Sequence, residues 1–417
     1  MPQDWKTAVF NRRMLICVFT GLSSGMPLFV LIQLLPAFLL EGGISIAAIG
    51  LFSLVMLPYN WKLLWAPLLD HYLPPLLGRR RGWLLIFQVC LLLSIGFLGA
   101  FSPSDATSMV VVLACALAFF SASQDIVIDA YRREILPDRE LGMGNAIHVQ
   151  AYRIASLVPG SLSLILADQM AWESVFWITA AFMLVGIAMT LAVSEPATEG
   201  SPAANLAEAV ILPFKEYLTR RGWKMMLLFL GFMCLYKLGD NMATALSTVF
   251  YLDIGYTKTE IGLVAKHAAL WPAIVGGLLG GLIMIKLGIN RSLWVFGVVQ
   301  LVSILGFAFL ASSEASLWLL ALVVGFEYLG VGLGTAAFTA FIARETSLTF
   351  AATQFALFTA LAALPRTVAS ATTGFMVEAV GWTDFFLLCA LFAFPGMLLL
   401  FRVAPWHEDA ESAAAAT

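Results

Sequence analysis

Two carboxylates lie four residues apart in the stretch SASQDIVIDAYRR at residues 121–133, which follows a long apolar run. Four residues make about one helical turn, so Asp125 and Asp129 share one face of a helix. A carboxylate at the centre of a bilayer costs about 2.5–3.5 kcal/mol on insertion scales. Acids that are kept inside a membrane helix therefore indicate a function such as proton transfer.

Further ionisable residues interrupt the apolar runs, and spacing or depth gives several of them a partner. Lys237 and Asp240 are three residues apart and can pair on one helix face. By depth, Lys62 is the expected partner of Asp125, and Glu327 that of Arg366. Structural ion pairs between helices are the alternative interpretation of each. The remaining members of the set are Arg153, Lys266 and His267.

The elements that must position these residues are transmembrane helices. The chain has 417 residues, of which 61% are apolar and 12% are charged, against about 25% charged in soluble domains. A formal net charge of −3 gives no indication of a nucleic-acid partner. The four histidines have no metal-ligand spacing and no nucleophile motif appears, so we expect neither an enzyme nor a metal site.

A spanning helix needs roughly 20 apolar residues, and twelve candidate spans satisfy this. The first begins after Arg12 and Arg13 and is too long for the core of a signal peptide. The candidate spans are 14–40, 46–69, 83–101, 108–131, 142–167, 173–193, 223–252, 259–285, 292–312, 315–343, 349–377 and 385–402.

The basic residues predict that both termini lie in the cytoplasm. With that orientation 17 of the 23 Lys and Arg residues fall in inner loops or tails, five fall inside spans, and only Lys258 falls in an outer loop. The opposite orientation reverses this bias. The inner-side residues are Lys6, Arg12, Arg13, Arg79, Arg80, Arg81, Arg132, Arg133, Arg139, Lys215, Arg220, Arg221, Lys224, Lys286, Arg291, Arg344 and Arg402.

The two halves of the chain repeat one another at a constant offset. FLLEGGISIAAIGL at 38–51 aligns with FYLDIGYTKTEIGL at 250–263, so that Ile-Gly-Leu occurs at the same place in both. We therefore expect an N-terminal six-helix bundle at 1–193, a cytoplasmic linker at 194–222, and a C-terminal six-helix bundle at 223–417 that ends in a short cytoplasmic tail. The end of the linker, LAEAVILPFKEYLTRR, is predicted to be an amphipathic helix on the membrane surface.

Every third span, namely the third, sixth, ninth and twelfth, has no ionisable residue in its interior. If these four spans face lipid, the other eight can surround a polar cavity. This arrangement resembles the major facilitator architecture. It predicts an all-α membrane protein with the major facilitator fold, in which 12 transmembrane helices form two six-helix pseudo-repeats around a central cavity.

Two motifs narrow the resemblance. SASQDIVIDAY in the fourth span, together with YNWKLLWAPLLDHY at 59–72 and GRRRGW at 78–83, is similar to the signature of the AmpG-type muropeptide permeases. The resemblance covers about 20–195 strongly, and the second half more weakly. The family implies import of anhydro-muropeptides, which are GlcNAc-anhydroMurNAc disaccharides with or without a peptide, across the bacterial inner membrane by proton-coupled symport.

The resemblance and the placement of charges together give a set of expected site residues. Asp125 is the first choice for proton coupling and Glu327 the second, with Asp129 and Asp240 as further candidates. A solvated carboxylate at the inner end of the fourth span is the alternative interpretation of Asp129. Cations and aromatic rings suit an anionic sugar-peptide, although packing is the alternative for each aromatic residue. The expected substrate-binding residues are Lys62, Gln124, Arg153, Lys237, Lys266, Arg366, Tyr59, Trp61, Tyr152, Tyr236 and Trp271.

A gate is expected at the inner ends of the second and fourth spans. Asp70 and the arginines at 79–81 resemble the inner-loop motif of major facilitators, in which an acid ending the second span meets a basic residue of the fourth. Arg132 or Arg133 is the expected partner of Asp70, with Arg79 and Arg80 in the same gate. An effect on membrane orientation is the alternative role for the arginines.

Several function classes stay open beside the muropeptide permease. The related acetyl-CoA transporters share a similar Lys-Leu-Leu-Trp-Ala-Pro stretch, so acetyl-CoA or another anionic metabolite is an alternative cargo. A permease-like sensor that does not transport is the alternative of a different class, whereas two six-helix halves without filter-like loops argue against a channel. We expect a monomer in the lipid membrane, with no cofactor besides the proton as coupling ion.

Overall fold

The computed structural model describes residues 11–196, 206–345 and 351–406, and all regular structure within these ranges is helical. The chain forms two compact units. Unit 1 comprises 1–45, 55–202 and 257–266, and unit 2 comprises 46–54, 203–256 and 267–417. The predicted division of the chain into halves at 193 and 223 stays a prediction.

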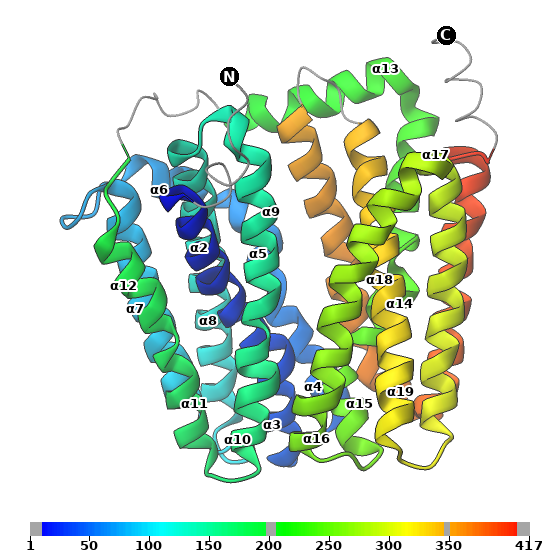
Figure 1. Ribbon diagram of the computed structural model, residues 1–417, viewed down its shortest axis with the longest axis horizontal. Helices are drawn as coiled ribbons and strands as arrows, with labels where there is room; N and C mark the ends of the chain where they lie inside the picture. The colour runs from blue at the N-terminus through cyan, green and yellow to red at the C-terminus, as the bar shows by residue number, and fades with distance from the viewer. Residues whose placement is uncertain (1–10, 197–205, 346–350, 407–417) are drawn as a thin grey trace. The chain divides into compact units, whose positions relative to one another are not determined.

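Unit 1 is built on the pairing of α2 with α9 and of α7 with α8, α11 and α12 (Figure 1). Two π-helical segments follow these helices along the chain, η1 after α2 and η4 after α9. Its elements are α2 (Arg12–Phe29), η1 (Val30–Leu34), α3 (Leu35–Glu41), α5 (Leu57–Trp61), η3 (Lys62–Leu64), α6 (Ala66–His71), α7 (Arg79–Leu98), α8 (Thr107–Ile135), α9 (Asp138–Ala155), η4 (Val158–Leu162), α10 (Ser163–Ala167), α11 (Trp172–Ala181), α12 (Met183–Ala192), α16 (Lys258–Glu260) and η5 (Ile261–Ala265).

Unit 2 is organised around its longest helix, α19, against which α4, α13 and α14 pack. An aromatic core fills this unit and includes the buried rings of Phe229, Phe232 and Phe341. Its elements are α4 (Ile46–Leu51), α13 (Leu206–Leu235), α14 (Leu238–Ala245), α15 (Ser247–Asp253), α17 (Lys266–Ala311), α18 (Leu317–Glu345) and α19 (Ala351–Val403); η2 (Phe52–Met56) crosses the boundary between the two units.

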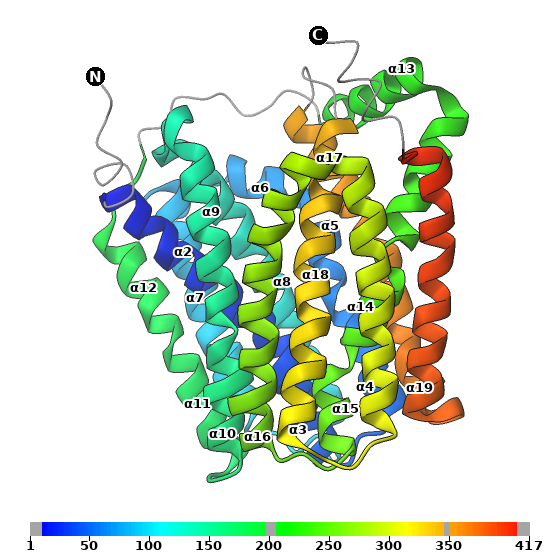
Figure 2. The same ribbon diagram turned by 45° about the vertical axis from the view of Figure 1, so that its right-hand side comes forward.

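The long helices of unit 2 are interrupted by glycines in the left-handed region. Gly222, Gly288 and Gly381 have φ values of 77°, 77° and 78° inside α13, α17 and α19. Because glycine has no Cβ, it adopts this conformation with little steric cost. In Figure 2 α17 accordingly runs as two long limbs joined at the break.

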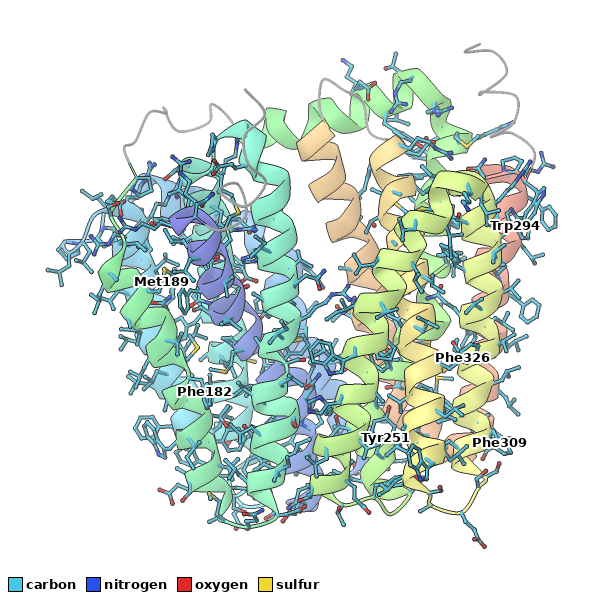
Figure 3. The ribbon with its side chains drawn as sticks, viewed as in Figure 1. Phe182, Met189, Tyr251, Trp294, Phe309 and Phe326 are labelled. Atoms are coloured by element: carbon cyan, nitrogen blue, oxygen red, sulfur yellow. The ribbon has the colours of Figure 1, made fainter. Side chains whose placement is uncertain are left out.

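Ten helices in the described part of the chain are long and apolar enough to cross a membrane, and Ile46–Trp61 is a shorter apolar helix. Large apolar side chains stay exposed on their outer faces, such as Phe309, which is 61% exposed (Figure 3). An exposed apolar surface of this extent is what a lipid environment requires. The chain is therefore an all-α, multi-pass membrane protein.

The second predicted span is not the regular helix expected over 46–69. The chain there passes through α4, η2, α5, η3 and α6, with a proline at the start of α5 and another at the start of α6. Proline lacks a backbone N–H and clashes with the preceding turn, so both positions favour a new helix start. Lys62 consequently lies on the short 3₁₀ segment η3, not in the middle of a continuous helix.

The repeat seen in the sequence has a structural counterpart at its turns. Gly43 and Gly255, which occupy equivalent positions in the two aligned segments, have φ values of +80° and +99°. Each follows a helix that ends in an acidic residue, α3 at Glu41 and α15 at Asp253. The same turn geometry therefore recurs in the two halves, as a duplication requires.

Candidate functional site

The signature carboxylate Asp125 is half-buried on α8 and receives a hydrogen bond from α2. Ser24 Oγ donates to Asp125 Oδ1 at 2.5 Å. The neighbouring Gln124 is fully buried and turns toward α2, where its Nε2 donates to the Ser23 carbonyl at 2.9 Å. The amide of Gln124 is thus engaged in the contact between two helices, and its predicted role in substrate binding stays a prediction.

Lys62, the partner predicted for Asp125 from depth, lies within electrostatic range of that carboxylate. The two do not form an ion pair within 4.0 Å. Lys62 makes no ion pair and no hydrogen bond with any of the described residues. Asp129 differs, because its carboxylate is 56% exposed and Oδ1 lies 2.6 Å from the Arg132 guanidinium. Of the two acids in the motif, only Asp125 is therefore half-buried, and the nearby Lys62 has no ionic partner among the described residues.

Two tyrosines, Tyr59 of α5 and Tyr152 of α9, lie in the same region as Asp125. The buried hydroxyl of Tyr59 lies beside Ser121 and within electrostatic range of Asp125 and Tyr152. Tyr152 packs its ring on Phe29 with centroids 5.4 Å apart. In unit 1 α5 thus packs against α8, and the Tyr59 hydroxyl on α5 lies within electrostatic range of Tyr152 on α9.

Arg153 follows Tyr152 near the end of α9 and is only partly buried. Within the described residues its guanidinium makes no hydrogen bond and no ion pair. A guanidinium presents five donors in a planar fork that matches a carboxylate. Arg153 therefore has the chemistry to bind an anionic ligand, and its N–H donors have no acceptor among the described residues.

Lys266 lies where three π-helical segments meet, because η4 contacts both η1 and η5. The side chain of Lys266 is buried and passes over Gly160 of η4, as does the amide oxygen of Gln33 from η1. π-Helical turns occur frequently at functional sites. This meeting point shows why a glycine stands at position 160, since a Cβ there would overlap Gln33.

A second polar cluster is enclosed in unit 2. Lys237 Nζ lies 2.6 Å from Asp240 Oδ2, which confirms the pair predicted from their spacing. Gln300 Nε2 donates to the same oxygen at 3.4 Å. Glu327 lies beside Asp240 and Ser303, is 0% exposed, and has no hydrogen-bond partner on either carboxylate oxygen in the part of the chain described.

The predicted pairing of Glu327 with Arg366 is wrong. Glu327 is fully buried beside Asp240, whereas Arg366 is exposed, and among the described residues no ion pair joins them. Similar depth on consecutive helices does not fix the direction in which a side chain points around the helix axis. Arg366, like Lys62 and Arg153, is left without an ionic partner in the described residues.

The predicted stacking residues divide into exposed and packed rings. Trp61 is 54% exposed and Trp271 is 50% exposed, with Trp271 Nε1 donating to His267 Nδ1 at 3.3 Å. Tyr236 is instead buried, stacks on Phe338 and donates its hydroxyl to the Leu293 carbonyl at 2.7 Å. The contacts of Tyr236 are thus those of a packed core residue, which was the alternative interpretation of the aromatic residues.

The predicted gate residues form ion pairs that the sequence did not indicate. Arg80 and Arg79 both reach Glu134 of α8, at 2.6 and 3.6 Å. Arg132 donates to Asn145 at 2.9 Å in addition to pairing with Asp129, and Arg133 is exposed. The side chain of Asp70 lies outside the described residues.

Glu195 is a further residue that sequence reasoning missed. Its carboxylate accepts the backbone N–H of Arg80 at 2.7 Å and that of Arg81 at 3.0 Å, and so caps the N-terminus of α7. A carboxylate at this position satisfies free N–H groups and interacts favourably with the helix dipole. The separation of 115 residues between Glu195 and Arg80 left no local signal to find it.

Comparisons with known proteins agree with this fold. A sequence model of the Major Facilitator Superfamily matches residues 17–370. An anhydromuropeptide permease of Escherichia coli strain K12 is 40% identical, over 93% of this chain and 79% of its own. An uncharacterized protein of Haemophilus influenzae is 50% identical over 98% of both chains. The crystal structure of a D-xylose-proton symporter superposes with a TM-score of 0.71 at 14% identity, covering 94% of this chain and 97% of its own.

The fold and these relatives define a multi-pass membrane transporter that moves a small molecule and has no enzymatic relatives among the matches described. The chain belongs to the major facilitator superfamily, and its resemblance to the AmpG-type permeases is confirmed. The likeness to the symporter structure carries the fold alone, because the identity is low.

Proposed function

We propose that this transporter imports anhydro-muropeptides across the bacterial inner membrane by proton-coupled symport and alternating access. The observation that carries the proposal is the polar region of unit 1. There the half-buried Asp125 lies within electrostatic range of Lys62, which has no ionic partner among the described residues. Tyr152 and Arg153 of α9 belong to the same region. The 40% identity to a permease whose name gives this cargo supports the same substrate.

The cations of the site suit the carboxylates of a peptide stem. Lys62 and Arg153 in unit 1 and Arg366 in unit 2 make no ion pair or hydrogen bond among the described residues, so each can bind an acidic group without first breaking a contact. A bidentate Arg–carboxylate contact is stronger and more directional than one to Lys. We propose Arg153 as the principal ligand of the peptide carboxylate.

Proton coupling is assigned first to Asp125 and second to Glu327, which shares its cluster with Asp240. Asp125 accepts a hydrogen bond from Ser24 and has Lys62 close enough to act on its charge. A change in the position of Lys62 would alter the balance between a charged and a neutral carboxyl. The proton is the only coupling ion proposed, the protein acts as a monomer, and both termini face the cytoplasm.

Ligand binding to the purified protein tests the cargo. The panel is the anhydro-disaccharide, the same disaccharide with a tripeptide, the free tripeptide and acetyl-CoA. A ligand that binds the folded protein at 100 times its Kd adds about 2.7 kcal/mol of stability, so its melting temperature rises. We expect a rise with the two sugar compounds, and the larger rise with the peptide-bearing one. A rise with acetyl-CoA alone would replace the proposed cargo.

A further inference from the structure

Charge in unit 2 is divided unevenly between the two ends of its long helices. At the end where α13 and α17 break and α18 and α19 finish, cations outnumber acids among the described side chains. The cations there are Lys215, Arg220, Arg221, Lys224, Lys286, Arg291, Arg344 and Arg402, and the acids are Glu216 and Glu345. The described side chains at the other end include the acids Asp253, Glu314, Glu378 and Asp384 and no cation of unit 2. The basic end therefore suits an anionic partner.

The first limb of α13, residues 206–221, is fastened to unit 2 by its buried face. The ring of Tyr217 is 0% exposed and stacks on Phe229, with the ring centroids 5.4 Å apart. Arg220 Nη2 donates to the Glu345 carbonyl at 2.7 Å. In Figures 1 and 2 this limb lies across the end of unit 2, whereas α13 beyond the break runs alongside the other long helices. The exposed side chains at the break are therefore held in place at the basic end.

The break at Gly222 places an aromatic ring and a cation at the start of the second limb, residues 223–235. Trp223 is 62% exposed, and Leu227, about one helical turn further along, is 51% exposed, so the two share one apolar face. Lys224 is exposed between them and makes no ion pair or hydrogen bond with any of the described residues. The indole N–H of Trp223 likewise has no acceptor among those residues. Two donors are thus available beside an exposed apolar face.

These side chains suit a lipid headgroup better than a soluble acidic protein. Tryptophan is enriched where the bilayer meets water, and basic residues beside a spanning helix attract anionic lipids. A phosphate accepts hydrogen bonds from an ammonium group and from an indole N–H. An acyl chain can continue along Leu227, which lies on the limb that forms the apolar span. A soluble protein could reach Lys224 but would gain nothing from Leu227.

We propose that Trp223 and Lys224 form a binding site for the headgroup of an anionic phospholipid. Lys224 Nζ and the Trp223 indole N–H donate to the phosphate, and an acyl chain covers Leu227. The lipid belongs to the leaflet at the basic end of unit 2, which the proposed orientation makes the cytoplasmic one. The site needs insertion in a membrane, but neither the proposed cargo nor proton coupling. The alternative is a diffuse effect of the basic residues on membrane orientation, which requires no particular residue.

Thermal unfolding of the purified full-length protein tests the site without any cargo. The protein in an uncharged detergent is titrated with phosphatidylglycerol, and separately with phosphatidylcholine that carries the same acyl chains. A lipid that binds the folded protein raises its melting temperature, so we expect a saturable rise that is larger with phosphatidylglycerol. Lys224→Gln should raise the phosphatidylglycerol concentration at half-maximal rise about fivefold, which corresponds to one basic residue near an anionic surface. Lys224→Arg, which keeps the charge, should retain the parental value.

Lys286→Gln is the matched control, because it removes an exposed cation from the same end of unit 2 but from α17. It should retain the parental half-maximal concentration. An unchanged value in Lys224→Gln, or equal changes in both variants, overturns the site in favour of diffuse charge. Equal rises with the two lipids in the parental protein overturn it as well. Glycerol phosphate should give no rise at the same concentrations, and a rise equal to that with phosphatidylglycerol would replace the lipid by a free anion.

Discussion

Asp125 is the residue on which the proposed coupling depends most. The Asp125→Asn variant keeps the shape and can still accept the hydrogen bond from Ser24, but it can no longer exchange a proton. We expect accumulation of cargo driven by a proton gradient to be lost, while exchange of labelled for unlabelled cargo persists. Uptake and counterflow in reconstituted vesicles measure both. Asp105→Asn, at an exposed acid in the loop between α7 and α8, is the control. Gradient-driven accumulation at the parental level in Asp125→Asn would reject the assignment.

Arg153 is the residue that should set affinity for the acidic part of the cargo. Because its guanidinium has no hydrogen-bond or ionic partner among the described residues, its removal breaks no such contact with them. Arg153→Gln should therefore raise the KM for the peptide-bearing disaccharide at least about tenfold, which is the loss of one charge-assisted contact of about 1.5–3 kcal/mol. The KM for the disaccharide without peptide should change little. Equal effects on both cargoes would mean that Arg153 does not contact the peptide.

At the scale of single residues the sequence predicted pairs well only when both partners lie close together in the sequence. The Lys237–Asp240 pair follows from a spacing of three residues and is present at 2.6 Å. To predict whether Glu327 pairs with Arg366, one must know how each helix is rotated about its own axis. Depth in the membrane does not give that rotation. Glu134 and Glu195 were missed for the same reason, since their arginine partners lie 54 and 115 residues away.

At the scale of helices and segments, the close approaches at Gly50 and Gly262 make a paired prediction. A Cβ on Gly50 would lie 2.8 Å from the Gly374 backbone nitrogen, and one on Gly262 would lie 2.9 Å from the Ser161 oxygen. Both contacts are to backbone, which cannot move aside as a flexible side chain does. Gly50→Ala and Gly262→Ala should each slow uptake several-fold without reducing the amount of inserted protein.

Gly277 provides the control for these two substitutions, because a Cβ built there meets nothing within 4 Å. Gly277→Ala removes a helical glycine of the same kind and should leave the uptake rate unchanged. If all three alanine variants transport alike, then the close approaches do not limit the transport cycle.

The cap on α7 makes a stability prediction at the same scale. Glu195→Gln removes the charge that two backbone N–H groups at the start of α7 share, so the interaction with the helix dipole is lost. We expect the variant to unfold more readily by about 1 kcal/mol, measured as a lower melting temperature in detergent. Binding of cargo, once corrected for folded fraction, should be unaffected. An unchanged melting temperature would show that the cap contributes nothing.

For helices, apolar length predicted most of the element order, because a bilayer demands about 20 apolar residues in each crossing. It failed at the second span, where two prolines divide 46–69 into short pieces, since hydropathy carries no information on backbone breaks. The π-helical turns η1, η4 and η5 were likewise not predicted, because hydropathy carries no information on the hydrogen-bond register within a helix.

At the scale of the whole molecule, the constant offset between 38–51 and 250–263 predicted the duplication, and the paired turns at Gly43 and Gly255 agree with it. The exchange of segments 46–54 and 257–266 between the compact units was not predicted. A repeat gives the pattern of each half but not the contacts that one half makes with the other. The ion pairs of Lys258 with Glu41 and Asp168 were therefore not predictable from the sequence, although Lys258 itself was noted as the one cation in an outer loop.

We propose that this molecule couples a proton gradient to the uphill movement of an anhydro-muropeptide. The most direct test measures uptake of labelled anhydro-disaccharide tripeptide into vesicles that contain the purified protein, with an imposed pH gradient that is acidic outside. We expect accumulation above the external concentration, which collapses when a protonophore is added. Uptake that only equilibrates the cargo, at the same rate with and without the gradient, would contradict it, and no uptake with intact binding would indicate a sensor.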